Sequence, residues 1–142
     1  MKISKKNRSL IVKELKYVAD SMDEHVTGQE KLYYFSGTYA VVQRILNTEF
    51  SQDLAFLHFV LRQTFDSFNG RLQAIIKAGE TVIQLTEEHF EKLSTLTKEL
   101  ADKIGKSEDL NDTLKKITVL TYTTTGNGFY LMQKGVINLN SI

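Results

Sequence analysis

Two pairs of acidic residues form the most conspicuous chemical motif of this chain. Glu88 and Glu91 make one pair, and Glu99 and Asp102 make a second pair shortly afterwards. Carboxylates spaced in this way on two facing helices can hold Mg²⁺ against a phosphate group. Here both pairs fall in one predicted helix, which places Glu88 and Glu99 about 16 Å apart along its axis. One ion cannot bridge that distance, so we interpret the acids as a solvated helix face with ion pairs such as Glu99 with Lys103.

The three histidines do not make a metal site either. His58 lies in an apolar run, and neither Leu54 nor Arg62, one helical turn away on each side, can share a metal with it. We expect a buried His58 that is hydrogen-bonded to a carbonyl or a carboxylate across the core. His25 and His89 lie beside acidic residues at predicted helix ends, where we interpret them as solvated.

Other catalytic and cofactor motifs are missing from the sequence. It has no cysteine, no Glu-x-x-His pair of the kind found in di-iron bundles, no Gly-rich phosphate loop and no Gly-x-Ser-x-Gly elbow. We therefore predict no catalytic residue, no metal and no cofactor.

Three arginines are the candidates for an anion site. Arg44, Arg62 and Arg71 fall in the second and third predicted helices, and a guanidinium matches the geometry of a phosphate. The alternative hypothesis for function rests on them. It is a bundle that binds a nucleotide or another small anionic cofactor in an inter-helical or inter-subunit cleft, with transferase or hydrolase activity. Arg62 and Asp66 are one helical turn apart, which also fits a plain ion pair.

Aromatic and apolar residues are concentrated between residues 33 and 68, which hold nine of the fourteen aromatic residues. Segment 54–61 is apolar at seven of its eight positions, so as a helix it must be covered on nearly every side, either inside the core or at the contact between subunits. Four aromatic residues fall outside the predicted buried stripes, and because tyrosine and phenylalanine are enriched at interfaces we propose them as interface residues. These are Tyr33, Tyr34, Phe56 and Phe59. Packing against the fifth helix is the alternative.

The leading hypothesis is therefore a non-enzymatic helical-bundle protein that acts through oligomerisation or through binding a partner protein. We expect a homo-oligomer, with a dimer as the first choice. The aromatic surface has no readable symmetry from which to decide the number of subunits.

Charge and hydropathy argue against a membrane and against a nucleic acid as partner, and binding of nucleic acid through the basic N-terminus is a third hypothesis. The formal net charge is +1, and no apolar run approaches the roughly 18 residues that span a membrane. Basic residues gather at the N-terminus, at Lys2, Lys5, Lys6, Arg8, Lys13 and Lys16, with Glu14 as the single acid. This order opposes the helix dipole, but no nucleic-acid motif accompanies it, so we interpret it as a solvated terminus. The absence of cysteine and of a signal-peptide pattern predicts a cytoplasmic protein.

Apolar spacings of three and four residues predict five helices. The chain has no proline where about seven are expected, which favours long helices with short connections. The predicted buried stripes are Ile11, Leu15, Val18 and Met22; Leu32, Phe35, Tyr39, Val42 and Leu46, with Phe50 as a further candidate; Leu54, Leu57, Leu61, Phe65, Phe68, Leu72 and Ile75; Phe90, Leu93, Leu96 or Thr97, Leu100 and Ile104; and Leu110, Leu114 and Ile117.

Capping signals place the helix ends. Thr27 and Glu30 have the spacing of a capping box, and Ser51 and Ser107 are suitable N-caps for the third and fifth helices. Gly105 suits the left-handed position that ends the fourth helix. Gly70 and Gly79 predict a kink or an end in the third helix.

The segment 118–137 is ambiguous. Threonines, valine and tyrosine favour strands, and Gly126-Asn127-Gly128 would form a hairpin turn, but apolar residues at helical spacing continue through it. Helix is favoured, because an isolated hairpin has no sheet to join. The predicted fold is all-α, a single domain over residues 1–142 that forms an up-and-down bundle of four to five antiparallel helices.

Overall fold

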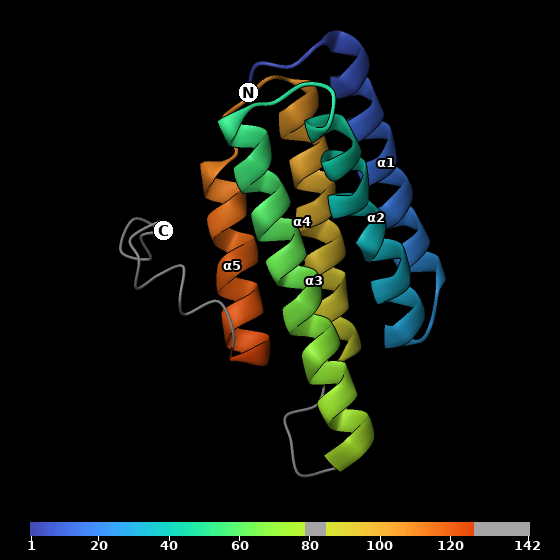
Figure 1. The fold of residues 1–142 in the computed structure, drawn as a ribbon. Coiled ribbons are helices and arrows are strands. Elements are labelled where there is room, and N and C mark those ends of the chain that lie inside the picture. The colour runs from blue at the N-terminus through green and yellow to red at the C-terminus, as the bar shows by residue number, and fades with distance from the viewer. Residues whose placement is uncertain (79–84, 127–142) are drawn as a thin grey trace.

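The computed structural model describes residues 1–78 and 85–126, and five helices account for most of them (Figure 1). The helices are α1 (Lys5–Glu24), α2 (Gly28–Leu46), α3 (Gln52–Ala78), α4 (Glu87–Gly105) and α5 (Asn111–Thr125). The described part of the chain contains no strand. The prediction of an all-α, single-domain helical bundle is confirmed.

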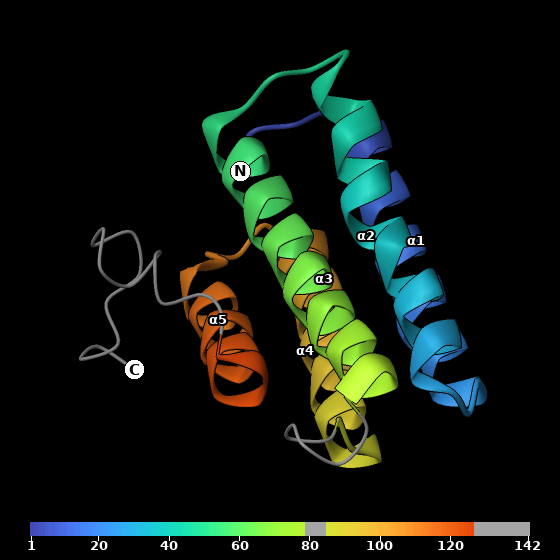
Figure 2. The same cartoon turned by 60° about the horizontal axis from the view of Figure 1, so that its bottom comes forward.

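The helices pack as a closed ring in which each runs opposite to the one before it in sequence. α1 lies between α2 and α4, α3 lies between α2 and α5, and α4 packs against α5 (Figures 1 and 2). Short connections join the antiparallel neighbours α1 and α2, and likewise α4 and α5, as predicted. The longer connection from α3 to α4 lets α4 take its place between α1 and α5. Because the ring has an odd number of members, one neighbouring pair must be parallel, and that pair is α3 and α5.

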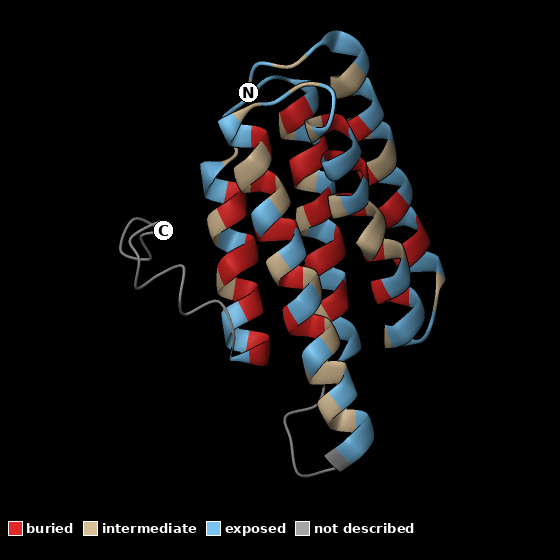
Figure 3. Cartoon of the chain, in the orientation of Figure 1, coloured by how far each residue is buried: buried red, intermediate tan, exposed pale blue. Residues whose placement is uncertain are grey.

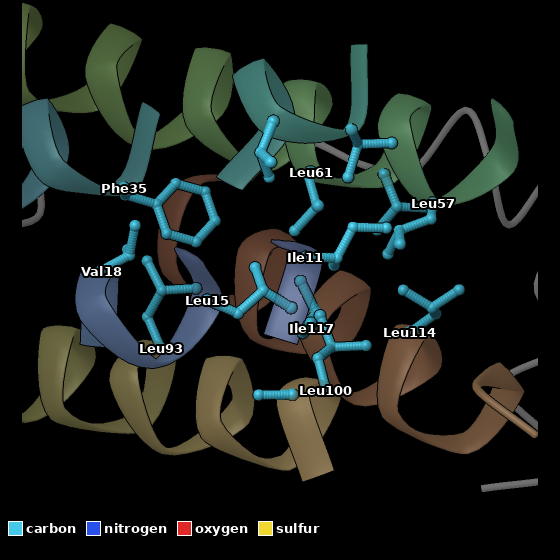
Figure 4. Packing of buried hydrophobic residues seen from close by; sticks show 14 of the residues in the cluster. Ile11, Leu15, Val18, Phe35, Leu57, Leu61, Leu93, Leu100, Leu114 and Ile117 are labelled. Atoms are coloured by element: carbon cyan, nitrogen blue, oxygen red, sulfur yellow. The ribbon is translucent and has the colours of Figure 1, made fainter. Parts of the chain in front are cut away.

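All five helices contribute to one hydrophobic core (Figure 4). The predicted stripe of α1 is fully inside it, and the inward residues of the other helices meet this stripe from both sides. The larger side chains with less than 2% exposure are Phe35, Phe68, Ile11, Leu15, Met22, Leu54, Leu57, Leu61, Leu93, Leu100, Ile104 and Ile117. Helix α3 continues through Gly70 to Ala78, so no end occurs at Gly70, and Gly79 lies outside the described residues.

Two predicted helix starts are confirmed, but the Glu30 carboxylate accepts from the Thr27 hydroxyl at 2.9 Å instead of completing the predicted capping box. The Thr27 hydroxyl oxygen accepts a hydrogen bond from the backbone N–H of Glu30 at 3.2 Å, and the Ser51 hydroxyl oxygen accepts one from the N–H of Leu54 at 3.4 Å. Each bond satisfies an amide that has no partner inside its own helix.

The turn between α4 and α5 differs from the prediction in the residue that takes the left-handed conformation. Gly105 is the last residue of α4, and Ser107 has the left-handed conformation, with φ of 56°. The N–H of Glu108 bonds to the carbonyl of Lys103 at 2.9 Å and that of Ser107 to the carbonyl of Ile104 at 3.2 Å, which is the Schellman pattern. Ser107 therefore ends α4 instead of capping α5.

Segment 118–125 is helical, so the strand alternative is excluded for these residues, while 127–137 lie outside the described part of the chain. The threonines that favoured a strand are accommodated by hydrogen bonds along the helix. The Thr121 hydroxyl donates to the carbonyl of Ile117 at 2.8 Å, and the Thr125 hydroxyl donates to the carbonyl of Thr121 at 2.7 Å. Both side chains are buried, and these bonds satisfy their polar atoms inside the protein.

Replacing Ser107 by glycine should stabilise the protein. A left-handed conformation costs an L-residue about 1–2 kcal/mol, and glycine avoids this cost but loses part of the gain through its more flexible unfolded state. We expect Ser107→Gly to raise the free energy of unfolding by about 0.5–1 kcal/mol in urea titrations. Ser107→Ala keeps the Cβ atom and is the matched control, which should give no gain. Equal stability of the two variants would contradict the strain argument.

Candidate interaction surface

A cluster of aromatic side chains covers the surface where α1 meets α2. The ring of Tyr34 contacts Tyr17 edge-on at 6.2 Å between centroids, Tyr33 edge-on at 5.4 Å and His25 at 4.5 Å. Tyr34 is half-buried, but Tyr17 is 56% exposed and Tyr33 is 73% exposed. We call Tyr17, Tyr33 and Tyr34 the tyrosine patch. Edge-on contacts are a favoured arrangement of aromatic rings, so these side chains support one another in defined positions.

Close packing of the two helices positions the patch. A Cβ atom on Gly37 of α2 would lie 2.9 Å from Oε1 of Glu14 and 3.2 Å from Cγ2 of Val18, so glycine lets α1 approach closely here. One turn earlier in α2, Tyr34 reaches the level of Tyr17 on the antiparallel α1.

His25 borders the tyrosine patch at the C-terminal end of α1, where its ring contacts Tyr34. It follows the last residue of α1, and its Nδ1 lies 2.7 Å from the carbonyl oxygen of Ser21. Its Nε2 lies 3.8 Å from a carboxylate oxygen of Glu30. His25 is thus held in place by contacts to both helices, and it is less solvated than predicted.

Tyr17 is an exposed aromatic residue that was not among the predicted interface residues. The available signal was its position directly before Val18, which puts Tyr17 outside the buried stripe of α1.

The four predicted interface residues do not form one surface. Tyr33 is near the start of α2, whereas Phe56 and Phe59 are near the start of the antiparallel α3, at the opposite end of the bundle. Arg62 lies over the ring of Tyr39, so these two residues are at about the same height along the bundle axis. Tyr33 and Phe59 lie on opposite sides of that height, because α2 and α3 are antiparallel, and are roughly 14 Å apart along the axis. Two separate aromatic patches result, and binding by either stays a prediction.

The apolar run 54–61 is buried on one side only. Leu54, Leu57, Val60 and Leu61 point into the core, but Phe59 is 45% exposed. Helix α3 is one wall of the ring, so the monomer leaves this run partly uncovered. Phe56 is half-buried and packs against the core.

The three arginines make separate contacts. Arg62 pairs with Asp66 at 3.2 Å and lies over the ring of Tyr39, with 4.8 Å from its guanidinium carbon to the ring centroid. Arg71 donates to the carbonyl of Thr125 at 2.8 Å, at the end of α5. Arg44 is exposed in the last turn of α2. A groove of about 600 Å³ lies between α4 and α5, and none of the three arginines lines it. Anion binding by these residues stays an untested prediction.

His58 differs from its prediction. Its Nε2 is buried and has no hydrogen-bond partner among the residues that the structure describes, so the expected bond across the bundle is absent there. Burial lowers the pKa of His58 below its usual value, and the positive charge of Arg62 lowers it further. Both effects favour the neutral imidazole over the charged one.

One acidic side chain of each pair in α4 forms a structural contact. Glu88 pairs with Lys92 one turn later at 3.1 Å, as predicted for a solvated face. Glu99 instead reaches α5, where it accepts a hydrogen bond from Thr113 at 2.7 Å and lies 3.4 Å from Nζ of Lys116. The predicted Glu99–Lys103 pair is thus replaced by contacts between helices. Residues 1–78 and 85–126 contain no cluster of three acidic or histidine side chains able to hold a metal ion.

Comparison with known proteins adds no assignment. No protein family, no curated protein and no solved structure matches the chain. Among the described helices, none is both long and apolar enough to cross a membrane.

The neutral His58 makes stability depend on pH. The pKa of His58 is about 6.5 in the unfolded chain and lower in the folded protein, so the unfolded state binds more protons as the pH falls. Its contribution to stability is complete above about pH 6.5 and is lost as the pH falls through the folded-state value. We expect the wild type to lose more unfolding free energy than His58→Gln between about pH 7.5 and about pH 5.5 in urea titrations. Parallel losses in the two proteins would refute this assignment.

Proposed function

We propose that this chain is a non-enzymatic interaction protein that associates with a second copy of itself through the tyrosine patch. The observation that carries the proposal is the contact of both Tyr17 and Tyr33 with the ring of Tyr34 at the surface, with Tyr17 and Tyr33 largely exposed. A reducing, cytoplasmic setting fits a chain without cysteine.

The chemistry of the patch supports binding to a protein. Tyrosine has a large apolar ring and a polar hydroxyl, which suits surfaces that are wet when free and buried when bound. The fold gains little from the exposed parts of Tyr17 and Tyr33, whereas a partner covering them would gain the burial of both rings. Because the rings hold one another in place, binding would cost little further side-chain entropy.

The second aromatic patch is a weaker candidate. Phe56 packs largely against the core of its own chain, which leaves Phe59 as the mainly exposed ring of the predicted pair. A single exposed apolar side chain is common on soluble proteins. The tyrosine patch has three rings in contact, which favours it.

Removing the tyrosine patch should weaken self-association and leave the fold intact. Serine and tyrosine have similar helix propensities, and the rings of Tyr17 and Tyr33 are mostly exposed. We expect Tyr17→Ser/Tyr33→Ser to weaken the dimer at least about tenfold, because each lost anchor acts twice in a symmetric pair. Its unfolding free energy should change by less than about 1 kcal/mol. Native mass spectrometry and sedimentation equilibrium measure the subunit number and the affinity.

Phe59→Ser is the matched control for the other aromatic patch and should leave the affinity unchanged. A wild-type protein that stays monomeric at millimolar concentration would refute self-association and direct attention to a different partner protein. A dimer that responds to Phe59→Ser and not to the tyrosine variant would move the interface to α3.

A further inference from the structure

Helix α1 has a second regular stripe, which faces outward. Lys6, Leu10, Lys13, Tyr17, Asp20 and Glu24 follow one another at spacings of four and three residues, and all six are exposed. We call these six residues the outer stripe of α1. At about 100° per residue, its centre is about 150° around the helix from the buried stripe that begins at Ile11. Figure 3 shows α1 at the edge of the bundle, with exposed residues between the buried ones.

The charges of the outer stripe are separated along the helix. Lys6 and Lys13 occupy the first half, and Asp20 and Glu24 occupy the second half. None of these four residues takes part in a salt bridge within the described chain.

This charge order works against the stability of α1 itself. The helix dipole favours acidic residues in the first turn and basic residues in the last turn, and α1 has neither. Helices α2, α3 and α4 have both, and α5 has an acidic first turn. Among the described helices, α1 alone thus has no charge of its own that complements its dipole at either end. Other parts of the chain supply these charges: the carboxylate of Glu49 accepts hydrogen bonds from Ser4 and Asn7 at the first turn, and Lys98 pairs with Asp23 in the last turn.

We propose that the outer stripe of α1 pairs with the outer stripe of a second copy in antiparallel orientation. Two-fold symmetry about the middle of the stripe then brings Lys6 of each copy opposite Glu24 of the other. It also brings Lys13 opposite Tyr17, where an ammonium group can lie over the aromatic ring. The basic half of one helix faces the acidic half of the other, and the two helix dipoles oppose each other favourably.

This inference rests on the proposed self-association and gives it a geometry. Tyr17 belongs to both the outer stripe and the tyrosine patch, so Tyr33 and Tyr34 would border the contact on the α2 side. Leu10, which is 45% exposed, would add apolar area between the Lys6–Glu24 and Lys13–Tyr17 contacts. One helix face from each copy makes a small interface, so we expect a reversible dimer that weakens as salt is added.

Disulfide cross-linking tests the orientation, because the chain has no cysteine of its own. Residues 6 and 24 are about 27 Å apart along α1, which is too far for a disulfide within one copy. Lys6→Cys/Glu24→Cys should therefore form a covalent dimer under mild oxidation. Neither Lys6→Cys nor Glu24→Cys should do so alone, but a mixture of the two single variants should. Covalent dimers of Lys6→Cys alone would indicate a parallel pair and overturn the proposal.

Charge reversal tests the complementarity. Lys6→Glu/Lys13→Glu makes the outer stripe acidic throughout, and Asp20→Lys/Glu24→Lys makes it basic throughout. Each variant alone should dimerise at least about tenfold more weakly than the wild type, since both Lys6–Glu24 contacts of the symmetric pair become repulsive. An equimolar mixture should recover the affinity by forming the mixed dimer. Circular dichroism checks that both variants remain helical.

The outcomes separate this inference from the proposed function. A wild-type dimer that neither cross-links between residues 6 and 24 nor responds to the charge reversals would overturn the α1 pairing and leave self-association standing. A wild-type monomer at every concentration would refute both. Cross-linking together with recovery in the mixture would establish the antiparallel pair.

Discussion

The burial of the apolar stripe of α1 between α2 and α4 is the contact on which the rest of this structure depends. Ile11, Leu15, Val18 and Met22 are at most 1% exposed, and each contributes about 1.5–3 kcal/mol by leaving water. Their joint contribution is comparable with the whole stability of a typical domain, whereas a surface ion pair contributes less than about 1 kcal/mol. The stripe therefore decides how α1 is rotated about its axis. The charges and Tyr17 on the outer side face solvent as a consequence.

The odd number of helices is the second constraint. A ring of five alternating helices must contain one parallel pair, and the long connection from α3 to α4 makes α3 and α5 that pair. The same topology separates residues that look like one group in the sequence. Consecutive antiparallel helices carry Tyr33 and Phe56 to opposite ends of the bundle, so an aromatic concentration in the sequence becomes two patches in space.

Polar groups inside the bundle show where local patterns were insufficient. The threonines of α5 favoured a strand, but hydrogen bonds to carbonyls one turn earlier let them remain in a buried helix. His58 was expected to form a hydrogen bond across the bundle, but its Nε2 has no partner among the described residues, and its ring lies edge-on to Tyr39. Glu99 contacts Thr113 and Lys116 on α5 instead of Lys103 on its own helix. Each outcome depends on a neighbouring helix, which periodicity within one helix does not describe.

The amino-acid sequence by itself determined the five helices, two of the N-caps, the all-α class and most residues of the buried stripes. Phe50 is an exception, because it was a candidate for the second stripe and is 73% exposed. These properties follow from spacings of three and four residues and from hydrogen bonds between residues close in the chain, which are local physics. Only the tertiary structure decided the order of the helices around the ring, the left-handed Ser107, the isolation of His58 and the meeting of Tyr17 with Tyr34. Those features depend on how helices far apart in sequence fill a shared core. The hydrophobic effect is not directional, so the apolar stripe of one helix does not specify which other helix will pack against it.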